Sequence, residues 1–205
     1  RRQRRRRENP VGLYRRLLAA SCGPVELIEI GYPQILAALL DSPADAYSPL
    51  DGESLVRAKV SRLWIMAGKW DEPDGGRENN FARNRRASAA AAHLCDRWPT
   101  PVTFLGWEVG STVISGAKLP DGDLLRQVLI DHGSAAGRSS WDPMLILLAA
   151  AGDPEKAGYR CVYGTASVDP ESGRNYFRQA SDGSHCYVVK LRPDAWYAAE
   201  IDRRL

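Results

Sequence analysis

The sequence predicts an α/β domain with a mainly parallel sheet flanked by helices, and two observations lead to this fold class. Residues 63–67 are continuously apolar and lack the alternation of a half-exposed strand, which is typical of a parallel strand buried on both faces. Residues 101–106 are interpreted as another buried strand, and an Ala-rich helical segment separates the two. Strands that alternate with helices imply right-handed crossovers, so we expect most strands to be parallel.

The first half of the chain is expected to alternate helices and strands. Asn9 and Pro10 are typical of a helix start, and we expect that helix to end near Gly23-Pro24. The expected elements that follow are a strand over 25–30, a turn over 31–33, a helix ending near Leu40, a loop over 41–52, a short helix over 53–59, a strand over 60–67, a loop over 68–76, a helix over about 84–98 and a strand over 101–106.

The second half of the chain has a looser pattern beyond Leu119. Two helices are expected, one over 121–132 and one from Asp142 to near Gly152. Residues 160–168 and 185–191 alternate like antiparallel strands, and a final helix is expected from about Pro193.

The composition is that of one globular domain, which we assign to residues 9–205. Hydrophobic residues make up 44% of the 205 residues and charged ones 26%, an ordinary balance for a chain that buries a core. No apolar run approaches the roughly 20 residues of a membrane helix, and no secretory signal is visible, so we expect a cytoplasmic protein without membrane contact. The four cysteines are widely spaced, which indicates free thiols rather than a zinc or disulfide framework.

The basic character of the chain is confined to its N-terminus. Residues 1–7 hold six arginines, so the formal charge of +3 leaves +3 − 6 = −3 for the rest of the chain. A basic arm of this kind can bind nucleic acid or an anionic membrane. Because no aromatic residues alternate with the arginines to stack bases, we expect residues 1–8 to be a solvated arm and nucleic acid not to be a partner.

Polar residues follow the expected strands, at the edge where ligands collect in open α/β sheets. Glu78 and Asn80 lie two positions apart after the strand over 60–67, and their side chains can bond the hydroxyls of one polyol. The structural alternative is that Asn80 caps the next helix.

Two further segments offer ligand groups at that edge. Asp142 suits Ca²⁺ or Mg²⁺ as a hard oxygen ligand, although Asp before Pro is also a common helix cap. Its neighbour Trp141 is suited either to stacking a base or to filling the core. The turn after the strand over 25–30 can turn backbone carbonyls, such as that of Gln34, toward a ligand.

Taken in order, these segments resemble the C-terminal two-thirds of the inosine–uridine-preferring nucleoside hydrolase family. Residues 60–68 resemble the family's strand ending in Met-Gly-Gly, and Glu78-Asn79-Asn80-Phe81 resembles its Glu-Phe-Asn signature. The Ala-rich helix over 87–92, the segments 98–102 and 106–110 and finally Ser140-Trp141-Asp142 resemble later parts of the family. The resemblance covers about residues 10–150 and depends on order and spacing.

The resemblance implies a Rossmann-like sheet and hydrolysis of a ribonucleoside to base and ribose. In that family a Ca²⁺ ion binds the ribose hydroxyls and a water molecule, which an aspartate deprotonates before it attacks C1′ of the sugar. By resemblance, Asp142 is a metal ligand, and the Gln34 carbonyl stands at the position of a backbone metal ligand. Glu78 and Asn80 are then expected to bind ribose hydroxyls, and Trp141 to contact the substrate.

Three departures from the family limit this expectation. The Asp-rich motif that supplies the other metal ligands and the base is absent, because Glu8 is the only acid before Glu26. Trp141-Asp142 replaces a His-Asp pair, as it does in some relatives. Gln34-Ile35 and Asn84 also replace commoner residues of the family. We therefore assign no catalytic residue and expect weak Ca²⁺ binding and little or no turnover.

The alternative is a non-catalytic relative that serves as a binding or assembly module. The two hypotheses differ on whether the gene encodes an Asp-x-Asp stretch upstream of Arg1. An exposed sheet edge, left where the family has a further strand, also favours a homo-oligomer.

Overall fold

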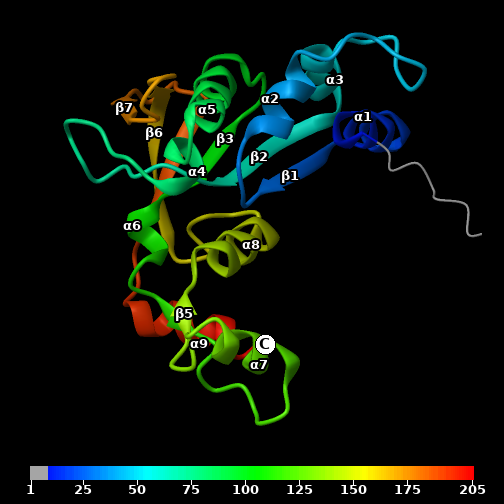
Figure 1. The fold of residues 1–205 in the computed structure, drawn as a ribbon. Coiled ribbons are helices and arrows are strands. Elements are labelled where there is room, and N and C mark those ends of the chain that lie inside the picture. The colour runs from blue at the N-terminus through cyan, green and yellow to red at the C-terminus, as the bar shows by residue number, and fades with distance from the viewer. Residues whose placement is uncertain (1–8) are drawn as a thin grey trace, which may run out of the picture.

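The computed structural model describes residues 9–205, so the arm predicted for residues 1–8 lies outside the described residues. One six-stranded sheet has the order β1-β2-β3-β8-β6-β7, and β4 and β5 form a separate two-stranded ribbon (Figure 1). The strands are β1 Val25–Glu29, β2 Val60–Met66, β3 Val102–Leu105, β4 Ile114–Ser115, β5 Arg138–Ser139, β6 Tyr159–Val168, β7 Asn175–Gln179 and β8 His185–Lys190.

The pairing of the strands confirms the predicted α/β class. Strands β1, β2, β3 and β8 run parallel to one another, whereas β6 is antiparallel to both β8 and β7. The expected antiparallel character of residues 185–191 therefore holds only on one side of β8, since its other neighbour is parallel. Strand β7 was not predicted, because most of its side chains are polar and exposed and its sequence shows no apolar face.

Helices cover both faces of the sheet. The layer of α1, α2, α3 and α5 lies on one face, and α8 and α9 lie on the other (Figure 1). No helix within residues 9–205 has both the length and the apolar character needed to cross a bilayer. The helices are α1 Pro10–Ala20, α2 Gln34–Leu40, α3 Gly52–Lys59, α4 Asn79–Ala82, α5 Arg85–Arg97, α6 Trp107–Gly110, α7 Leu124–Asp131, α8 Trp141–Ala151 and α9 Asp194–Asp202.

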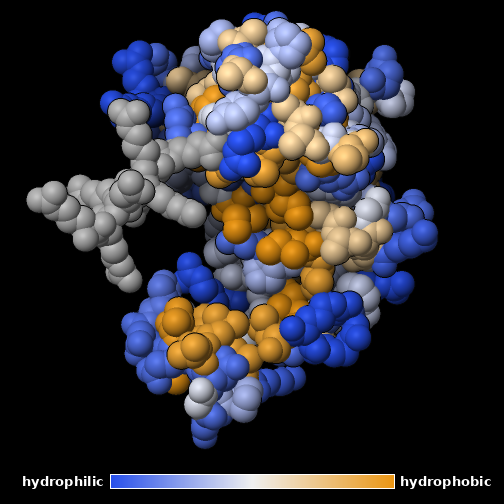
Figure 2. All heavy atoms as spheres, turned by 90° about the vertical axis from the view of Figure 1, so that its right-hand side faces the viewer, coloured by the Kyte–Doolittle hydropathy of each residue, from blue (hydrophilic) through white to orange (hydrophobic). Residues whose placement is uncertain are grey.

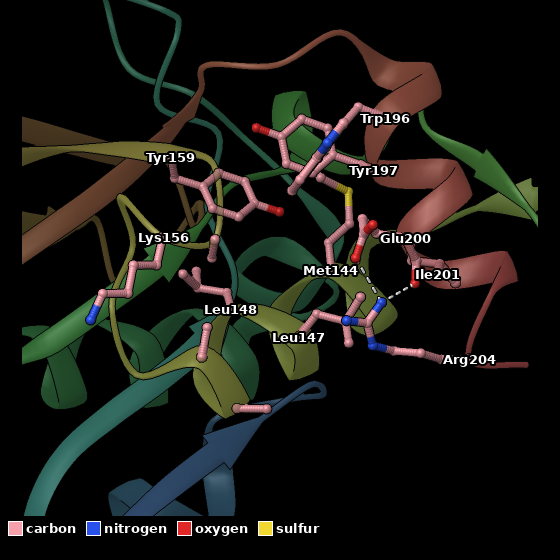
Figure 3. A pocket seen from close by; sticks show the side chains of 13 residues that line it. Met144, Leu147, Leu148, Lys156, Tyr159, Trp196, Tyr197, Glu200, Ile201 and Arg204 are labelled. Atoms are coloured by element: carbon pink, nitrogen blue, oxygen red, sulfur yellow. Dashed lines mark hydrogen bonds and ion pairs between the residues drawn. The ribbon is translucent and has the colours of Figure 1, made fainter.

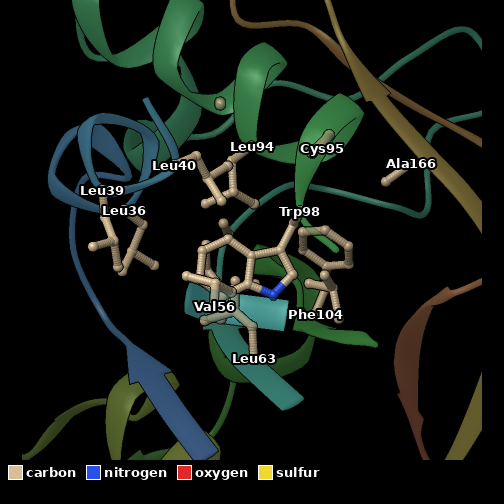
Figure 4. Close-up of a cluster of buried hydrophobic side chains, with 14 of the residues drawn as sticks. Leu36, Leu39, Leu40, Val56, Leu63, Leu94, Cys95, Trp98, Phe104 and Ala166 are labelled. Carbon is tan, nitrogen blue, oxygen red and sulfur yellow. The ribbon is translucent and has the colours of Figure 1, made fainter. Parts of the chain in front are cut away.

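The buried strand β2 supplies side chains to two hydrophobic cores. Leu63 and Ile65 pack under α2, α3 and α5, while Trp64 and Met66 point to the opposite face under α8. In the first core the indole of Trp98 lies among leucines from α2 and α5 and next to Phe104 (Figure 4). The residues of the run over 63–67 are thus continuously apolar because the strand is buried on both faces, as predicted.

One side of the molecule keeps apolar residues exposed. Strand β1 is the edge strand of the sheet. Ile28 in this strand and Ile30 directly after it are 45% and 44% exposed. Helix α7 has no buried residue, and its Leu124 is 84% exposed. Figure 2 shows hydrophobic residues gathered across the middle and the lower part of this side. A free strand edge with apolar neighbours can accept a further strand.

Candidate functional site

The carboxyl ends of β1, β2 and β3 lie at the same edge of the sheet, because these adjacent strands are parallel. Ligands bind at this edge in open α/β folds. We define the carboxyl edge as residues 29–34, 66–80, 106–110 and 140–142. It includes every residue that the sequence analysis proposed for the site.

Glu78 caps helix α4 and ties its loop to the end of β2. Its Oε1 accepts hydrogen bonds from the backbone amides of Phe81 at 2.8 Å and Gly68 at 3.0 Å, and its Oε2 accepts one from the amide of Asn80 at 2.6 Å. Burial raises the pKa of Glu78, and the three amides partly offset that rise. Of the roughly four hydrogen bonds that a carboxylate can accept, three are already made by the protein.

Asn80 is buried beside Glu78 and does not cap a helix. Its Nδ2 donates to the carbonyl oxygen of Met66 at 2.8 Å, while its own carbonyl oxygen has no partner within residues 9–205. The capping alternative is wrong, because Glu78 caps α4 and Asn84 caps the longer α5 by accepting a hydrogen bond from the amide of Ala87 at 3.0 Å.

A chain of hydrogen bonds joins Glu78 to Trp141 across the ends of β2 and β3. Gly68 donates to Glu78, and its carbonyl accepts from the amide of Trp107 at 2.8 Å. The carbonyl of Trp107 in turn accepts from the indole Nε1 of Trp141 at 2.7 Å. Gly68 has a φ of +81°, and a Cβ there would lie 2.3 Å from the Trp70 ring, so the junction requires glycine. The structure thus brings Glu78, Asn80 and Trp141 together.

Two indoles lie side by side at the carboxyl edge. The ring centroids of Trp107 and Trp141 are 6.5 Å apart with an interplanar angle of 35°. Trp107 is 42% exposed and Trp141 is half-buried, so part of each ring faces solvent. The ammonium of Lys69 lies 5.6 Å from the centroid of the Trp107 ring. Sequence reasoning missed Trp107, because a tryptophan after a buried strand looks the same whether it fills the core or lines a site.

Glu108 is a second candidate that the sequence analysis did not propose. Burial raises the pKa of Glu108 to about 7, Asp71 adds to the rise, and Lys69 opposes it. Its Oε2 accepts a hydrogen bond from the amide of Trp70 at 3.2 Å. Gly106 leaves space for this carboxyl, since a Cβ there would lie 2.3 Å from Oε1. The sequence signal that could have indicated Glu108 is Gly106-x-Glu108 directly after a strand. A carboxyl group with a pKa near neutral pH suits proton transfer.

Asp142 lies in the first turn of α8 and leaves its carboxylate free. Ser140 holds the N-cap position and its carbonyl accepts the amide of Met144 at 3.0 Å, so the capping alternative for Asp142 is wrong. No hydrogen bond or ion pair within residues 9–205 engages the Asp142 carboxylate. Burial raises its pKa, and the positive charge of Arg138 opposes that shift. This carboxylate is available to a ligand.

Gln34 begins α2 after the loop that follows β1. The loop contacts the rest of the carboxyl edge through Tyr32, whose hydroxyl lies 3.5 Å from Nδ2 of Asn79. Carbonyls in the first turn of a helix accept amides four residues later, so the Gln34 carbonyl takes part in the α2 ladder. At the end of β1, burial raises the pKa of Glu29, which accepts a hydrogen bond from the amide of Gly31 at 2.8 Å.

The residues present do not by themselves fit a calcium ion. Ca²⁺ takes six to eight oxygen ligands. Within residues 9–205 no group of three or more His, Cys, Asp and Glu side chains is placed to hold a metal ion. Asp142 offers a free carboxylate, but Glu78 is committed to backbone amides and the Gln34 carbonyl to a helix.

A buried asparagine from the far edge of the sheet secures the loop after β2. Asn175 of β7 accepts from the amide of Lys69 at 3.0 Å and donates to the carbonyl of the same residue at 2.8 Å. A hollow of about 470 Å³ opens beside this contact, between the loop and β7. Sequence reasoning missed Asn175, because its partner lies 106 residues away.

A separate apolar cavity of about 350 Å³ lies between α8 and α9 (Figure 3). Its wall includes Tyr159, Trp196 and Tyr197, and an ion pair between Glu200 and Arg204 stands at its rim. None of the residues predicted for the site lines it, so the cavity is distinct from the carboxyl edge.

Comparison with known proteins identifies the fold. No family model matches the sequence, and no curated protein matches it either. Among solved structures, an inosine–uridine-preferring nucleoside hydrolase from Bacillus anthracis matches with a TM-score of 0.54 over 98% of this chain and 67% of its own, at 15% identity. The chain shares the nucleoside hydrolase fold.

A second solved structure agrees with this fold. The type III effector protein XopQ, complexed with adenosine diphosphate ribose, matches with a TM-score of 0.55 and 15% identity. The alignment covers 95% of this chain but 63% of the effector, so the chain spans less than two thirds of that neighbour. At 15% identity both matches establish the fold alone.

Proposed function

We propose that the carboxyl edge is the sugar- and base-binding wall of a site for ribonucleosides. The reaction we assign to the complete site is hydrolysis of the N-glycosyl bond to base and ribose. The observation that carries the proposal is the hydrogen-bond chain from Glu78 through Gly68 and Trp107 to Trp141, which unites polar and aromatic groups at one edge.

The sugar-facing role rests on polar groups with unused hydrogen-bonding capacity. Asp142 has a free carboxylate, and the carbonyl oxygen of Asn80 has no partner within residues 9–205. Glu78 retains capacity for about one further hydrogen bond. The pKa of each of Glu78, Glu108 and Asp142 is raised by burial, and groups shifted in this way gather at functional sites.

The base-facing role rests on the paired indoles of Trp107 and Trp141. An exposed aromatic face stacks on a nucleobase with about 1–3 kcal/mol per base. The hydrogen bond from the Trp141 indole to the backbone carbonyl of Trp107 fixes the Trp141 ring relative to the Trp107 backbone, which lowers the ordering cost of binding. Glu108 stands on the same short helix and can exchange a proton near neutral pH.

Binding is tested by isothermal titration calorimetry with inosine, uridine and adenosine diphosphate ribose as separate ligands. For whichever nucleoside binds the unmodified chain, we expect Trp107→Ala and Asp142→Asn each to raise the dissociation constant at least tenfold. The matched control is Trp196→Phe, which alters an indole on α9 that is 37% exposed and outside the edge. The proposal is wrong if no nucleoside binds, or if both edge variants bind as tightly as the unmodified chain.

Turnover and calcium binding are tested separately from nucleoside binding. We propose that this chain binds Ca²⁺ weakly and hydrolyses inosine or uridine little or not at all, because the residues present supply too few oxygen ligands. A calorimetric titration with CaCl₂ and a reducing-sugar assay with and without the ion check this. Tight calcium binding or clear hydrolysis would contradict the expectation of an incomplete site and leave the nucleoside-binding proposal intact.

A second candidate function, assembly of two copies, is favoured by the free edge of β1. An antiparallel pairing of β1 with β1 of a second copy obeys twofold symmetry and would cover Ile28 and Ile30. Light scattering after size-exclusion chromatography should then show a dimer that Ile28→Lys dissociates. The control is Leu191→Lys, which adds the same charge at a residue that is 55% exposed and distant from β1 in the sheet. A monomer at all concentrations would exclude this candidate.

A further inference from the structure

Two cysteines face each other across neighbouring strands. Neither belongs to the carboxyl edge. Cys161 of β6 and Cys186 of β8 have their Sγ atoms 3.5 Å apart. In the antiparallel register Cys186 lies opposite Tyr163, and Cys161 lies opposite Val188. The two cysteines are therefore diagonal neighbours on the same face of the sheet.

The two thiols have different access to solvent. Cys186 is buried at 6% exposure, whereas Cys161 is half-buried and lines an open hollow between β6 and the end of β7. A small oxidant can therefore reach the pair from one side, while Cys186 stays shielded from larger thiols. Cys95, by contrast, lies on α5 and is buried in the first hydrophobic core. Cys22 is exposed and has no cysteine partner within residues 9–205.

We propose that Cys161 and Cys186 form a reversible dithiol–disulfide pair that small peroxides oxidise. The inference is independent of the nucleoside-binding proposal, because neither cysteine belongs to the carboxyl edge. It makes the pair a modification site on the α8 and α9 face of the sheet, next to the second hydrophobic core.

The surroundings of the pair favour a thiolate on Cys186. The hydrogen bond with Cys161 lowers the pKa of Cys186 to about 7 against the effect of burial, and Thr103 and Arg62 lower it further. The pKa of Cys161 is raised, first by its hydrogen bond with Cys186 and then by burial. Burial raises the pKa of Cys95 to about 12, which makes that thiol unreactive.

The reaction balances with hydrogen peroxide as the oxidant. The Cys186 thiolate attacks one peroxide oxygen, so that an S–O bond forms, the O–O bond breaks and hydroxide leaves. The Cys161 sulfur then attacks the Cys186 sulfur, the S–O bond breaks, and the thiol proton and the departing hydroxide form water. The first hydroxide takes up the proton that Cys186 released on ionising. Two thiols thus lose two electrons in total, and one peroxide becomes two water molecules.

The product disulfide should be easy to reduce. Diagonal Cα atoms on antiparallel strands lie about 7–8 Å apart. Disulfides usually span about 4.4–6.8 Å between Cα atoms, so closing this bond must draw β6 and β8 together locally. Strained disulfides have higher reduction potentials, and we expect a small dithiol to restore both thiols.

The test uses the full chain, reduced, freed of reductant and treated with about one equivalent of hydrogen peroxide. The remaining thiols are then alkylated in urea, which exposes the buried ones. Trypsin separates residues 161–174 from residues 179–190, so a bond between the two cysteines appears as one cross-linked pair of peptides. We expect loss of two alkylatable thiols per chain, this cross-link, and full recovery of both thiols with dithiothreitol. Cys22 and Cys95 should stay alkylatable.

Single variants assign the two roles. Cys161→Ser should form no cross-link and leave a sulfenic acid on Cys186 that dimedone labels once urea has unfolded the chain and exposed this residue. Cys186→Ser should leave Cys161 unlabelled under the same conditions. The control Cys95→Ser should still form the cross-link. The proposal is overturned if both thiols of the unmodified chain survive peroxide, or if Cys22 oxidises as fast as the pair. Cross-links between chains in place of the internal one would overturn it as well.

Discussion

Replacing Glu108 by glutamine should make the chain more stable at alkaline pH. The carboxyl of Glu108 has a pKa of about 7 in the fold against an ordinary 4.5, because burial disfavours its charged form. The folded chain therefore holds this proton more tightly than the unfolded chain. The stabilisation is fully present below pH 4.5 and is lost as the pH rises through about 7.

The size of the effect follows from the difference between the two pKa values. A difference of about 2.5, at about 1.4 kcal/mol for each pKa unit, corresponds to about 3 kcal/mol lost between pH 4.5 and pH 8. Glu108→Gln keeps an oxygen to accept the Trp70 amide and cannot ionise. The free energy of unfolding of the variant minus that of the unmodified chain should therefore rise by up to about 3 kcal/mol over this pH range.

Urea denaturation followed by tryptophan fluorescence at pH 4.5, 6, 7 and 8 measures this difference. Using the difference between two chains removes the contributions of other buried groups that titrate over the same range. Glu155→Gln is the control, because it removes one negative charge from an exposed residue after α8. If Glu108→Gln and Glu155→Gln show the same pH dependence, burial does not raise the pKa of Glu108 and our reasoning about the carboxyl edge is wrong.

Three further substitutions test the packing that supports the site. Glu78→Gln should destabilise the chain by about 2 kcal/mol in urea denaturation, because one amide oxygen cannot accept three backbone amides; an unchanged midpoint would contradict the capping role. Trp98→Ala should cost about 3–5 kcal/mol by the same assay, since it empties the centre of the first core. Arg15→Lys should lower the urea midpoint, because Arg15 is buried and its Nε and Nη2 both donate to Asp45; equal midpoints would show that one ammonium suffices.

The strands that could be predicted from sequence are those whose burial requires apolar residues at most positions. Strands β2 and β3 are buried on both faces, so their apolar runs identified them and the α/β class together. Strand β7 carries polar, exposed side chains, and its position depends on pairing with β6 and on the bridge between Gly76 and Asn175. Such pairing is set by contacts between distant segments, which no local pattern records.

For the candidate site, residue types were easier to predict than roles. Glu78 was proposed from its place after a buried strand and Trp141 from its place at the start of an apolar helix, and both lie at the carboxyl edge. Their partners are backbone atoms of Gly68 and Trp107, whose directions depend on the geometry at the strand ends. Glu108 was missed for a similar reason, since its raised pKa results from burial that the sequence does not reveal.

A strand added at the free edge of β1 would act on two features at once, the oxygen ligands at the carboxyl edge and the exposed side chains of Ile28 and Ile30. A further strand pairing in parallel with β1 would end at the carboxyl edge, beside the loop that follows β1. Acidic residues at the end of such a strand would add oxygen ligands to the carboxyl edge, which Ca²⁺ requires. The same strand would cover Ile28 and Ile30, which β1 now leaves exposed. The two features should therefore be lost or restored together, and a peptide strand that binds β1 and carries carboxylates should raise calcium affinity and bury this apolar surface at once.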